Sequence, residues 1–318
     1  FDLLFVPEAL PAVAPVLPGI KVIPGLPVLS FWHWIIAIFV VAVVHEFSHG
    51  VFARLYNTHV KSSGIALFGP ILGAFVEPDE KILSKKSKTA QLSVFAAGPF
   101  SNILLGLVFL ALFTYVATPL YNDVYMADGI IVNELVKDYP ASKLGVATPF
   151  IIRGINNQET LNYTSFIEYT KDIKPGDTIS LSTDKGNFEV KSVENPDNKS
   201  RAFIGISGLE LNKKVRPQIT ERYGNALPSA FTWVHMLVFW LVIVNFGVGL
   251  FNLLPLGPID GGRMFLSGML ALFSEQKAKK IWTFATFTCL ALIVVNLAPY
   301  LWKLLVFIFK PLMLILGL

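Results

Sequence analysis

The sequence predicts a polytopic α-helical membrane protein that carries a soluble α/β insert. Hydrophobic residues make up 53% of its 318 residues and charged residues only 15%, whereas an ordinary soluble domain has about 25% charged residues. Several apolar stretches approach the roughly 20 residues that a helix needs to cross a bilayer core. Residues 119–228 differ: charges, asparagines and glycines return, with short β-branched runs between turn signals. The basic residues are dispersed, which argues against a nucleic-acid partner.

Residues 1–30 form the first region, which is apolar but carries six prolines. Proline removes a backbone donor and interrupts helices, so we expect an irregular segment associated with the membrane. The chain begins with Phe1 rather than methionine, and we therefore expect residues to be missing upstream.

Residues 31–118 are expected to form the first half of a membrane core. Apolar sequence predicts one helix over 31–55 and a second over 90–118. Between them, an apolar stretch alternates around a glycine-proline turn at Gly69, which predicts a β-hairpin. Lipid cannot satisfy the open edge of a hairpin, so this one must be buried in protein or line a cavity.

Residues 229–275 are expected to complete the core, and residues 276–318 to add C-terminal transmembrane helices. A break near Pro299 separates the last two predicted helices. The predicted helices cover residues 229–254, 263–274, 279–297 and 299–316.

The orientation follows from the basic residues between the first two helices. Their number predicts that this connection is cytoplasmic. The insert then lies outside the cytoplasm, and residues 255–263 return to the cytoplasmic side, where the first helix ends. The basic residues are Arg54, Lys61, Lys81, Lys85, Lys86 and Lys88.

The end of the first helix carries an H-E-x-x-H pattern formed by His45, Glu46 and His49. Positions i and i+4 lie on one helix face, so both imidazoles can bind one zinc ion while Glu46 serves as general base toward a water molecule. The alternative is a chance match at a polar helix end. Ionisable groups in a membrane helix are energetically costly and generally mark a functional site, which favours the zinc interpretation.

A catalytic zinc ion of this kind needs a third protein ligand and an open position for water. Candidates in the hydrophobic regions are Asp260, Glu275 and His33. Asp260 follows a helix that is interrupted at Pro255, and a broken membrane helix is tolerated only where its backbone lines a cavity or is buried in protein. Taken alone, these residues favour a different role for Asp260, as the N-cap of the helix expected near Arg263.

Asn252, Pro255, Asp260 and Gly261 form the pattern N-x-x-P-x-x-x-x-D-G. Together with the H-E-x-x-H helix, this pattern resembles the site-2 protease family, the intramembrane zinc metalloproteases of peptidase family M50, in its prokaryotic or archaeal form. The resemblance extends over most of the chain. It implies a membrane protein with several spans, and the orientation inferred from the basic residues places the zinc centre toward the cytoplasmic side.

The resemblance implies a role for each residue of the zinc centre. His45, His49 and Asp260 would bind one zinc ion per chain, and Glu46 would activate the water.

The resemblance also implies residues that contact the substrate or stabilise the transition state: Asn252, Pro255, Asn102 and Gly98. Gly98 and Asn102 match a G-x-x-x-N element of the second core helix. For Asn102, helix packing beside Gly98 is an equal alternative. The apolar hairpin resembles the membrane-associated hairpin of the family, which presents the substrate as an added strand.

Residues 127–207 of the insert resemble a PDZ domain. The match is carried by the sequences DGIIVNELVKDYPASKLGV, FIIRGINNQET and KPGDTISLST. A PDZ groove binds peptide termini or edges. The alternative, which we favour, is a steric gate that excludes bulky ectodomains without binding a peptide.

The sequence therefore predicts an intramembrane zinc metalloprotease of the cell membrane. It would cleave membrane-anchored substrates within or near their transmembrane segments, with the lipid bilayer as its other partner. The competing prediction is a catalytically silent membrane scaffold with a structural zinc ion and a PDZ-like binding domain. The presence of Glu46 argues against it, since a scaffold needs no general base. A metal transporter would need ligands repeated along several helices, where only His33 and His235 remain.

Overall fold

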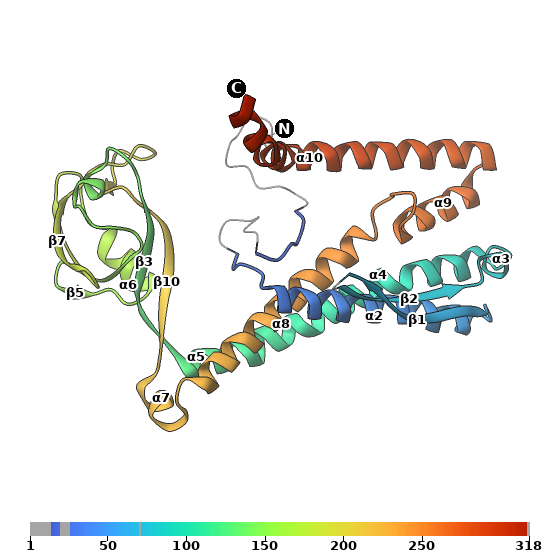
Figure 1. Ribbon diagram of the computed structural model, residues 1–318, viewed down its shortest axis with the longest axis horizontal. Helices are drawn as coiled ribbons and strands as arrows, with labels where there is room; N and C mark the ends of the chain where they lie inside the picture. The colour runs from blue at the N-terminus through green and yellow to red at the C-terminus, as the bar shows by residue number, and fades with distance from the viewer. Residues whose placement is uncertain (1–13, 20–25, 70, 317–318) are drawn as a thin grey trace. The chain divides into compact units, whose positions relative to one another are not determined.

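The computed structural model describes residues 14–19, 26–69 and 71–316 (Figure 1). The chain divides into two compact units. One holds the chain up to Ala117 and from Trp233 onward, and the other is Thr118–Thr232. The second unit is close to the insert expected at 119–228. Most of the irregular segment expected at 1–30 lies outside the described residues.

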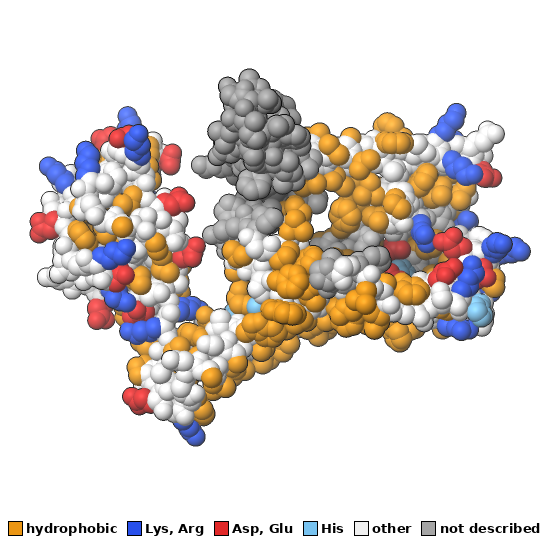
Figure 2. All heavy atoms as spheres, in the orientation of Figure 1, with side chains coloured by type: hydrophobic (Ala, Val, Ile, Leu, Met, Phe, Trp, Pro, Cys, Tyr) orange, Lys and Arg blue, Asp and Glu red, His pale blue; other side chains and the backbone are white. Residues whose placement is uncertain are grey.

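Four helices of the described residues are long and apolar enough to cross a membrane. In Figure 2, hydrophobic side chains dominate the visible surface of the helices, whereas charged side chains gather on the insert and at one end of the helical unit. This distribution agrees with the membrane-protein class that the composition predicts. The four spans are Phe31–Leu55, Lys88–Val124, Ala226–Phe251 and Glu275–Ala298.

The helical unit begins with α2 (Phe31–Leu55), whose bounds are those expected from the sequence. Ser30 caps the helix, because its hydroxyl accepts the backbone N–H of His33. The buried residues of α2 recur at every fourth position and form one stripe, which contains both histidines of the H-E-x-x-H motif. They are His33, Ala37, Val41, His45, His49 and Ala53.

The second core helix, α4 (Lys88–Leu112), packs against α2. It continues through a π-helical turn (Phe113–Ala117) into α5 (Thr118–Val124), so it extends beyond the helix expected at 90–118. Its buried face also repeats every four residues, with two glycines and an asparagine on the stripe. This part of the stripe is Val94, Gly98, Asn102 and Gly106.

The two core helices are joined through a β-hairpin. Strands β1 (Val60–Phe68) and β2 (Ile71–Pro78) pair in antiparallel orientation, and β2 packs against α2. Gly69 lies in the turn with a φ of +62°, a conformation that favours glycine. The short helix α3 (Glu80–Leu83) follows. The hairpin therefore lies beside the helix that carries the two histidines.

After the insert, α8 (Ala226–Phe251) leads through a loop to α9 (Asp260–Leu272) and α10 (Glu275–Leu316). The prediction of two helices separated near Pro299 is wrong, because α10 is one continuous helix in the structure. A proline removes one backbone hydrogen bond and bends a helix without ending it, and membrane helices tolerate such positions.

The insert contains a six-stranded sheet in the order β10-β3-β4-β6-β7, with β5 paired to β4. The strands β8 and β9 form a separate pair. The strands are β3 (Tyr125–Leu135), β4 (Phe150–Ile155), β5 (Gln158–Glu159), β6 (Thr178–Thr183), β7 (Gly186–Lys191), β8 (Val193–Glu194), β9 (Ala202–Phe203) and β10 (Ile206–Val215). The helices are a 3-10 turn (Pro140–Lys143), α6 (Tyr163–Thr170) and α7 (Pro217–Tyr223).

Apolar residues of the central strands form the core of the insert. Val132, Phe150, Ile152 and Leu181 are at most 1% exposed and pack together. Phe150 and Ile152 are two residues apart on β4, as expected for one face of a strand. The insert therefore has a hydrophobic core of its own.

A buried carboxylate, Asp128 on β3, links three strands of this sheet. Asp128 is 6% exposed and accepts hydrogen bonds from Arg153 Nη2 of β4 at 2.8 Å and Lys214 Nζ of β10 at 2.7 Å. Burial acts to raise the pKa of Asp128, but the hydrogen bonds and positive charges of Lys214 and Arg153 outweigh burial and hold that pKa below its usual range. The folded insert thus favours the ionised carboxylate.

The substitution Asp128→Asn is expected to lower the free energy of unfolding of the insert by roughly 1–2 kcal/mol at neutral pH, since both cationic partners are partly solvated. A carboxyl pKa that is lowered by folding stabilises the protein above the unfolded value of about 3.9, and this stabilisation is lost as the pH falls through the folded value. Urea unfolding of the full chain in detergent, followed by the β-sheet amide I band at pH 7 and pH 3, measures the difference. An equal loss of stability on acidification in both proteins would contradict this role.

Candidate metal centre

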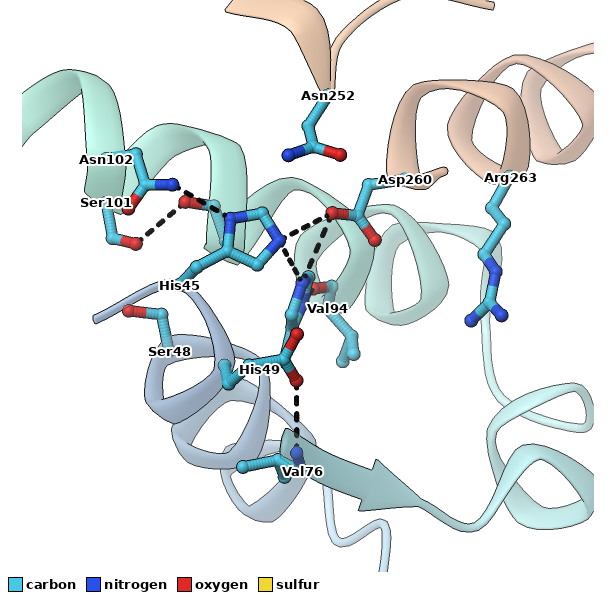
Figure 3. A network of polar contacts seen from close by, with 12 residues as sticks. His45, Ser48, His49, Val76, Val94, Ser101, Asn102, Asn252, Asp260 and Arg263 are labelled. Carbon is cyan, nitrogen blue, oxygen red and sulfur yellow. Dashed lines mark hydrogen bonds and ion pairs between the residues drawn. The ribbon is translucent and has the colours of Figure 1, made fainter. Parts of the chain in front are cut away.

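His45, His49 and Asp260 place three potential ligand atoms around one point (Figure 3). The Nε2 atoms of His45 and His49 lie 3.0 and 3.3 Å from Oδ2 of Asp260 and 3.2 Å from each other. Both histidines are 8% exposed. The structure therefore brings together the three residues that were predicted as zinc ligands, two from α2 and one from α9.

Asp260 is the first residue of α9, and its carboxylate points at the two histidines. The N-cap of the helix is Ile259, which makes no side-chain capping bond, so the capping role considered for Asp260 is not what the structure shows. Gly261 donates its N–H to the carbonyl of Asn252 at 2.7 Å. A Cβ at Gly261 would overlap the backbone of the preceding loop, so this tight turn requires glycine.

The second ring nitrogen of His49 determines its tautomer. His49 Nδ1 lies 2.7 Å from the carbonyl oxygen of Val94. A carbonyl only accepts hydrogen bonds, so Nδ1 carries the hydrogen and Nε2 presents a lone pair to the cluster. A neutral histidine held in this way is oriented to bind a metal ion.

Asn102 holds His45 from the side away from Asp260. Its Nδ2 lies 3.0 Å from His45 Nδ1, and its buried Oδ1 has no hydrogen-bond partner among the described residues. The amide nitrogen and oxygen exchange places when the group turns over, and Oδ1 then accepts the Nδ1–H of His45. In that arrangement His45 also presents an Nε2 lone pair. Asn102 is 0% exposed and lies behind the ring, where it contacts His45; a role toward substrate stays a prediction.

The surroundings of the three atoms fit a zinc ion. When neither Nε2 carries a hydrogen, two lone pairs and a carboxylate oxygen meet within 3.3 Å, and a cation between them relieves their mutual repulsion. Gly98 leaves the necessary space, because a Cβ there would lie 2.5 Å from His49 Nε2 and 2.6 Å from His45 Nε2. Two imidazoles and one carboxylate are a typical donor set for zinc. Gly98 therefore borders the two histidines of the cluster, whereas a contact with substrate was predicted.

A cavity of about 320 Å³ opens beside the ligands. Glu46 lines it, and its Oε2 accepts the backbone N–H of Val76 at 3.0 Å. Asn252 points toward the cluster from the loop after α8 (Figure 3). Arg263, one turn after Asp260, lines the same cavity. The carboxylate predicted as general base and the amide predicted to contact substrate thus share one cavity with the three candidate ligands.

Three other predicted candidates lie elsewhere. The carbonyl of Pro255 accepts a hydrogen bond from α10, so this residue holds the loop in place and is not among those that line the cavity. His33 Nε2 lies 2.9 Å from the carbonyl oxygen of Trp233, in a contact between α2 and α8. Glu275 forms an ion pair within α10. Neither His33 nor Glu275 is part of the cluster.

Sequence reasoning missed the contacts that backbone atoms make at this centre. The carbonyl of Val94 and the amide of Val76 contact His49 and Glu46, but every residue type carries such groups. One signal was present, in Gly50, which directly follows the H-E-x-x-H motif. A Cβ at Gly50 would lie 3.1 Å from Cγ1 of Val76, so glycine allows β2 to lie close to the helix.

An H-E-x-x-H helix whose histidines meet a distant aspartate among apolar helices defines the class of membrane metallopeptidases. The family model described as peptidase family M50 matches residues 33–295, which is most of the chain. The chain belongs to peptidase family M50, the site-2 protease family.

Curated relatives come from archaea and bacteria. The chain is 33% identical over 263 residues to an uncharacterized protein of Methanocaldococcus jannaschii, and the aligned region covers 82% of this chain and 61% of that protein. A protein of Clostridium acetobutylicum is 25% identical over 326 residues, covering 80% of this chain and 90% of its own length. The zinc metalloprotease RasP of Shouchella clausii is 23% identical over 226 residues, and the aligned region covers 58% of this chain and 51% of that protein. The chain thus spans less than two thirds of the first and third of these relatives.

Two solved PDZ domains of SdrC-like proteins align with part of this chain. They come from Listeria innocua and Listeria monocytogenes, with 24% and 22% identity over 25% and 30% of the chain. The TM-score is 0.23 for each. The PDZ-like character of the insert stays a prediction.

Proposed function

We propose that the chain is an intramembrane zinc metallopeptidase that hydrolyses peptide bonds within or near the transmembrane segments of membrane-anchored proteins. The observation that carries the proposal is the convergence of His45, His49 and Asp260 beside Glu46, in a cavity of the apolar helical unit. Membership of family M50 and a relative named as a zinc metalloprotease support it.

His45, His49 and Asp260 would hold one zinc ion per chain through their Nε2 and carboxylate atoms. When bound, zinc lowers the pKa of water toward neutrality and polarises a carbonyl group. The contacts of Val94 and Asn102 hold both imidazole rings from behind. The rings are therefore oriented before the metal arrives.

Glu46 would act as the general base and then as the general acid. It follows His45 directly, lines the cavity and is not part of the ligand cluster, so its carboxylate lies close enough to act on a water molecule there. It would take the proton of the attacking water and deliver it to the leaving amide nitrogen. Asn252, which points into the same space, would donate a hydrogen bond to the carbonyl oxygen under attack.

The hairpin would present the substrate. A peptide bond within a helix is shielded, so a transmembrane segment must unwind before water reaches its carbonyl. Strand β2 packs against α2 and lines the cavity with Val76 and Pro78. Its open edge would take up the unwound segment as an added strand.

The membrane orientation is proposed from charge. The basic connection between α2 and α4 would be cytoplasmic, with the zinc centre toward that side and the insert on the opposite side. The insert would act as a steric gate that excludes bulky ectodomains, so that another protease would trim substrates first. Capture of peptide termini or ectodomains by the PDZ-like insert is the competing role.

The competing function is a catalytically silent scaffold with a structural zinc ion. Structural zinc sites are typically closed by four protein ligands. Among the described residues, three candidate ligands border a cavity, and the carboxylate of Glu46 lines that cavity without joining the cluster. An open coordination position beside a carboxylate favours hydrolysis over a structural role.

The proposal is tested with the purified full chain in liposomes and a panel of single-span substrates. We expect about one zinc ion per chain and cleavage that stops with a chelator and returns with added zinc. Bound zinc without cleavage of any substrate would favour the scaffold.

The substitution Asp260→Ala is expected to lower zinc affinity by at least about 100-fold, because it removes a direct ligand, and even loss of an outer contact typically costs 10–100-fold. Zinc content after competition with a chelator measures the loss. The matched control is Glu275→Ala, which removes the other carboxylate that was considered as a ligand and should leave zinc in place. Full zinc retention in Asp260→Ala would mean that the third ligand lies elsewhere.

A further inference from the structure

The amide of Val76 joins the general base to the open edge of the hairpin. Val76 lies opposite Ser63 in the antiparallel pair, but its N–H donates to Glu46 Oε2 at 3.0 Å. In an antiparallel ladder the N–H and C=O of a residue point to the same side. Val76 therefore presents both groups on the edge away from β1. Ala74 and Leu72, at alternate positions, present theirs on the same edge.

The helix is shaped to allow this contact. Glu46 and Gly50 lie one turn apart on α2 and therefore share a face. Because a Cβ at Gly50 would lie 3.1 Å from Cγ1 of Val76, the glycine lets β2 approach the turn from which Glu46 projects. The contact between strand and carboxylate thus depends on the close packing of β2 against the helix.

The same edge borders the cavity that contains the ligands. Val76, Glu46 and His49 all line it. An extended peptide that adds to the open edge of β2 needs the N–H of Val76 for one of its own carbonyl oxygens. That N–H is already bound to Glu46, and one amide hydrogen supports one strong hydrogen bond. The carboxylate and the substrate backbone therefore compete for the same donor.

We propose that the Val76 amide acts as a latch: it holds the general base, Glu46, in the free protein, and an extended substrate backbone releases that base. In the free protein the amide holds Glu46 against β2. A substrate carbonyl that pairs with the Val76 amide displaces the Glu46 carboxylate. Both carboxylate oxygens then face the cavity, where they can act on a water molecule. The inference rests on the proposed function. Release of the carboxylate makes the base available when a transmembrane segment has unwound onto the hairpin. Val76 is a positioning residue, because it acts through Glu46.

The test measures substrate binding in two inactive, zinc-loaded variants. Glu46→Gln and Glu46→Ala both remove the charge and the base, but glutamine retains an acceptor for the Val76 amide and alanine does not. A fluorescent single-span peptide should bind Glu46→Ala on the order of tenfold more tightly than Glu46→Gln, since no side chain competes for the amide. Equal affinity would overturn the latch.

A proline at position 76 removes the N–H, and proline is tolerated at the open edge of a strand. In the Val76→Pro background, the difference between the alanine and glutamine variants should disappear. Ala74→Pro is the matched control, because it removes an open-edge amide that does not contact Glu46, and the difference should persist there. Persistence of the difference in Val76→Pro would also overturn the latch.

Hydrogen exchange gives a readout that needs neither proline nor catalysis. The β2 peptide that contains Val76 should exchange on the order of tenfold faster in Glu46→Ala than in Glu46→Gln when no substrate is present, and an unchanged rate would contradict the latch.

Cleavage by the unsubstituted chain distinguishes the failure of the latch from the failure of the proposed function. If that chain cleaves the peptide while both variants bind it equally, the latch fails and the proposed function stands.

Discussion

Replacement of Glu46 by glutamine is expected to abolish cleavage of a transmembrane substrate while zinc stays bound. Glutamine has the same shape and can still accept a hydrogen bond, but it cannot take up the proton of the attacking water. Loss of general-base catalysis alone lowers a rate by about 10²–10⁴-fold. The three atoms that converge on the metal position belong to His45, His49 and Asp260, so the substitution removes no ligand.

The measurement pairs substrate cleavage with metal content. Glu46→Gln and the unsubstituted chain are compared on a panel of single-span substrates in liposomes, and zinc is determined in the same samples. Glu80→Gln is the control, because Glu80 also lines the cavity but is 71% exposed and forms a surface ion pair with Arg263. Such pairs contribute little to stability, so cleavage should change only slightly. Undiminished cleavage by Glu46→Gln would refute the assigned mechanism.

The substitution Gly98→Ala is expected to remove zinc and activity together. The added methyl group would lie 2.5 Å from His49 Nε2 and 2.6 Å from His45 Nε2, in the space toward which the Nε2 lone pairs of the imidazoles point. The imidazoles cannot withdraw easily, because Val94 and Asn102 hold them from the other side. Alanine is a better helix former than glycine by about 1 kcal/mol, so α4 itself should not be weakened.

A glycine without neighbours provides the control for this substitution. Gly247 lies within α8, and a Cβ there would meet no described atom within 4 Å beyond its chain neighbours and its own helix backbone. Gly247→Ala makes the same chemical change in another core helix and should retain both zinc and cleavage. Zinc content, cleavage and thermal unfolding of both variants separate a blocked site from a damaged fold. One zinc ion per chain in Gly98→Ala would show that the histidines are not placed as described.

Local pattern accounts for the parts of the fold that were predicted well. The bounds of α2 follow from a capping serine and an apolar run of membrane length. Its buried stripe at every fourth residue places His45 and His49 on the same side, as the H-E-x-x-H spacing predicts. These features depend on residues within a few turns of each other.

Predictions that depended on distant packing were less accurate. Asn102 was assigned to substrate or to helix packing, and its contact with Nδ1 of His45 appears only when α4 lies against α2. Pro299 was expected to end a helix, because the penalty of a proline is visible in the sequence while the packing that tolerates it is not. The position of Val76 against Glu46 had no signal in residue type, since the contact uses a backbone amide.

By itself, the sequence determined the membrane class, the separate insert and the pair of histidines with an adjacent carboxylate. These follow from hydrophobicity, composition and helical period, which are properties of neighbouring residues. The residues alone favoured a helix cap at Asp260, and only the family resemblance implied that it is the third ligand. The tertiary structure shows the contact itself, because packing brings Asp260 to His45 across 215 positions of sequence. The tertiary structure also decided how His49 and Glu46 are held, because both contacts use backbone groups that every residue type carries. The space that Gly98 leaves beside the two histidines likewise exists only once the helices have packed together.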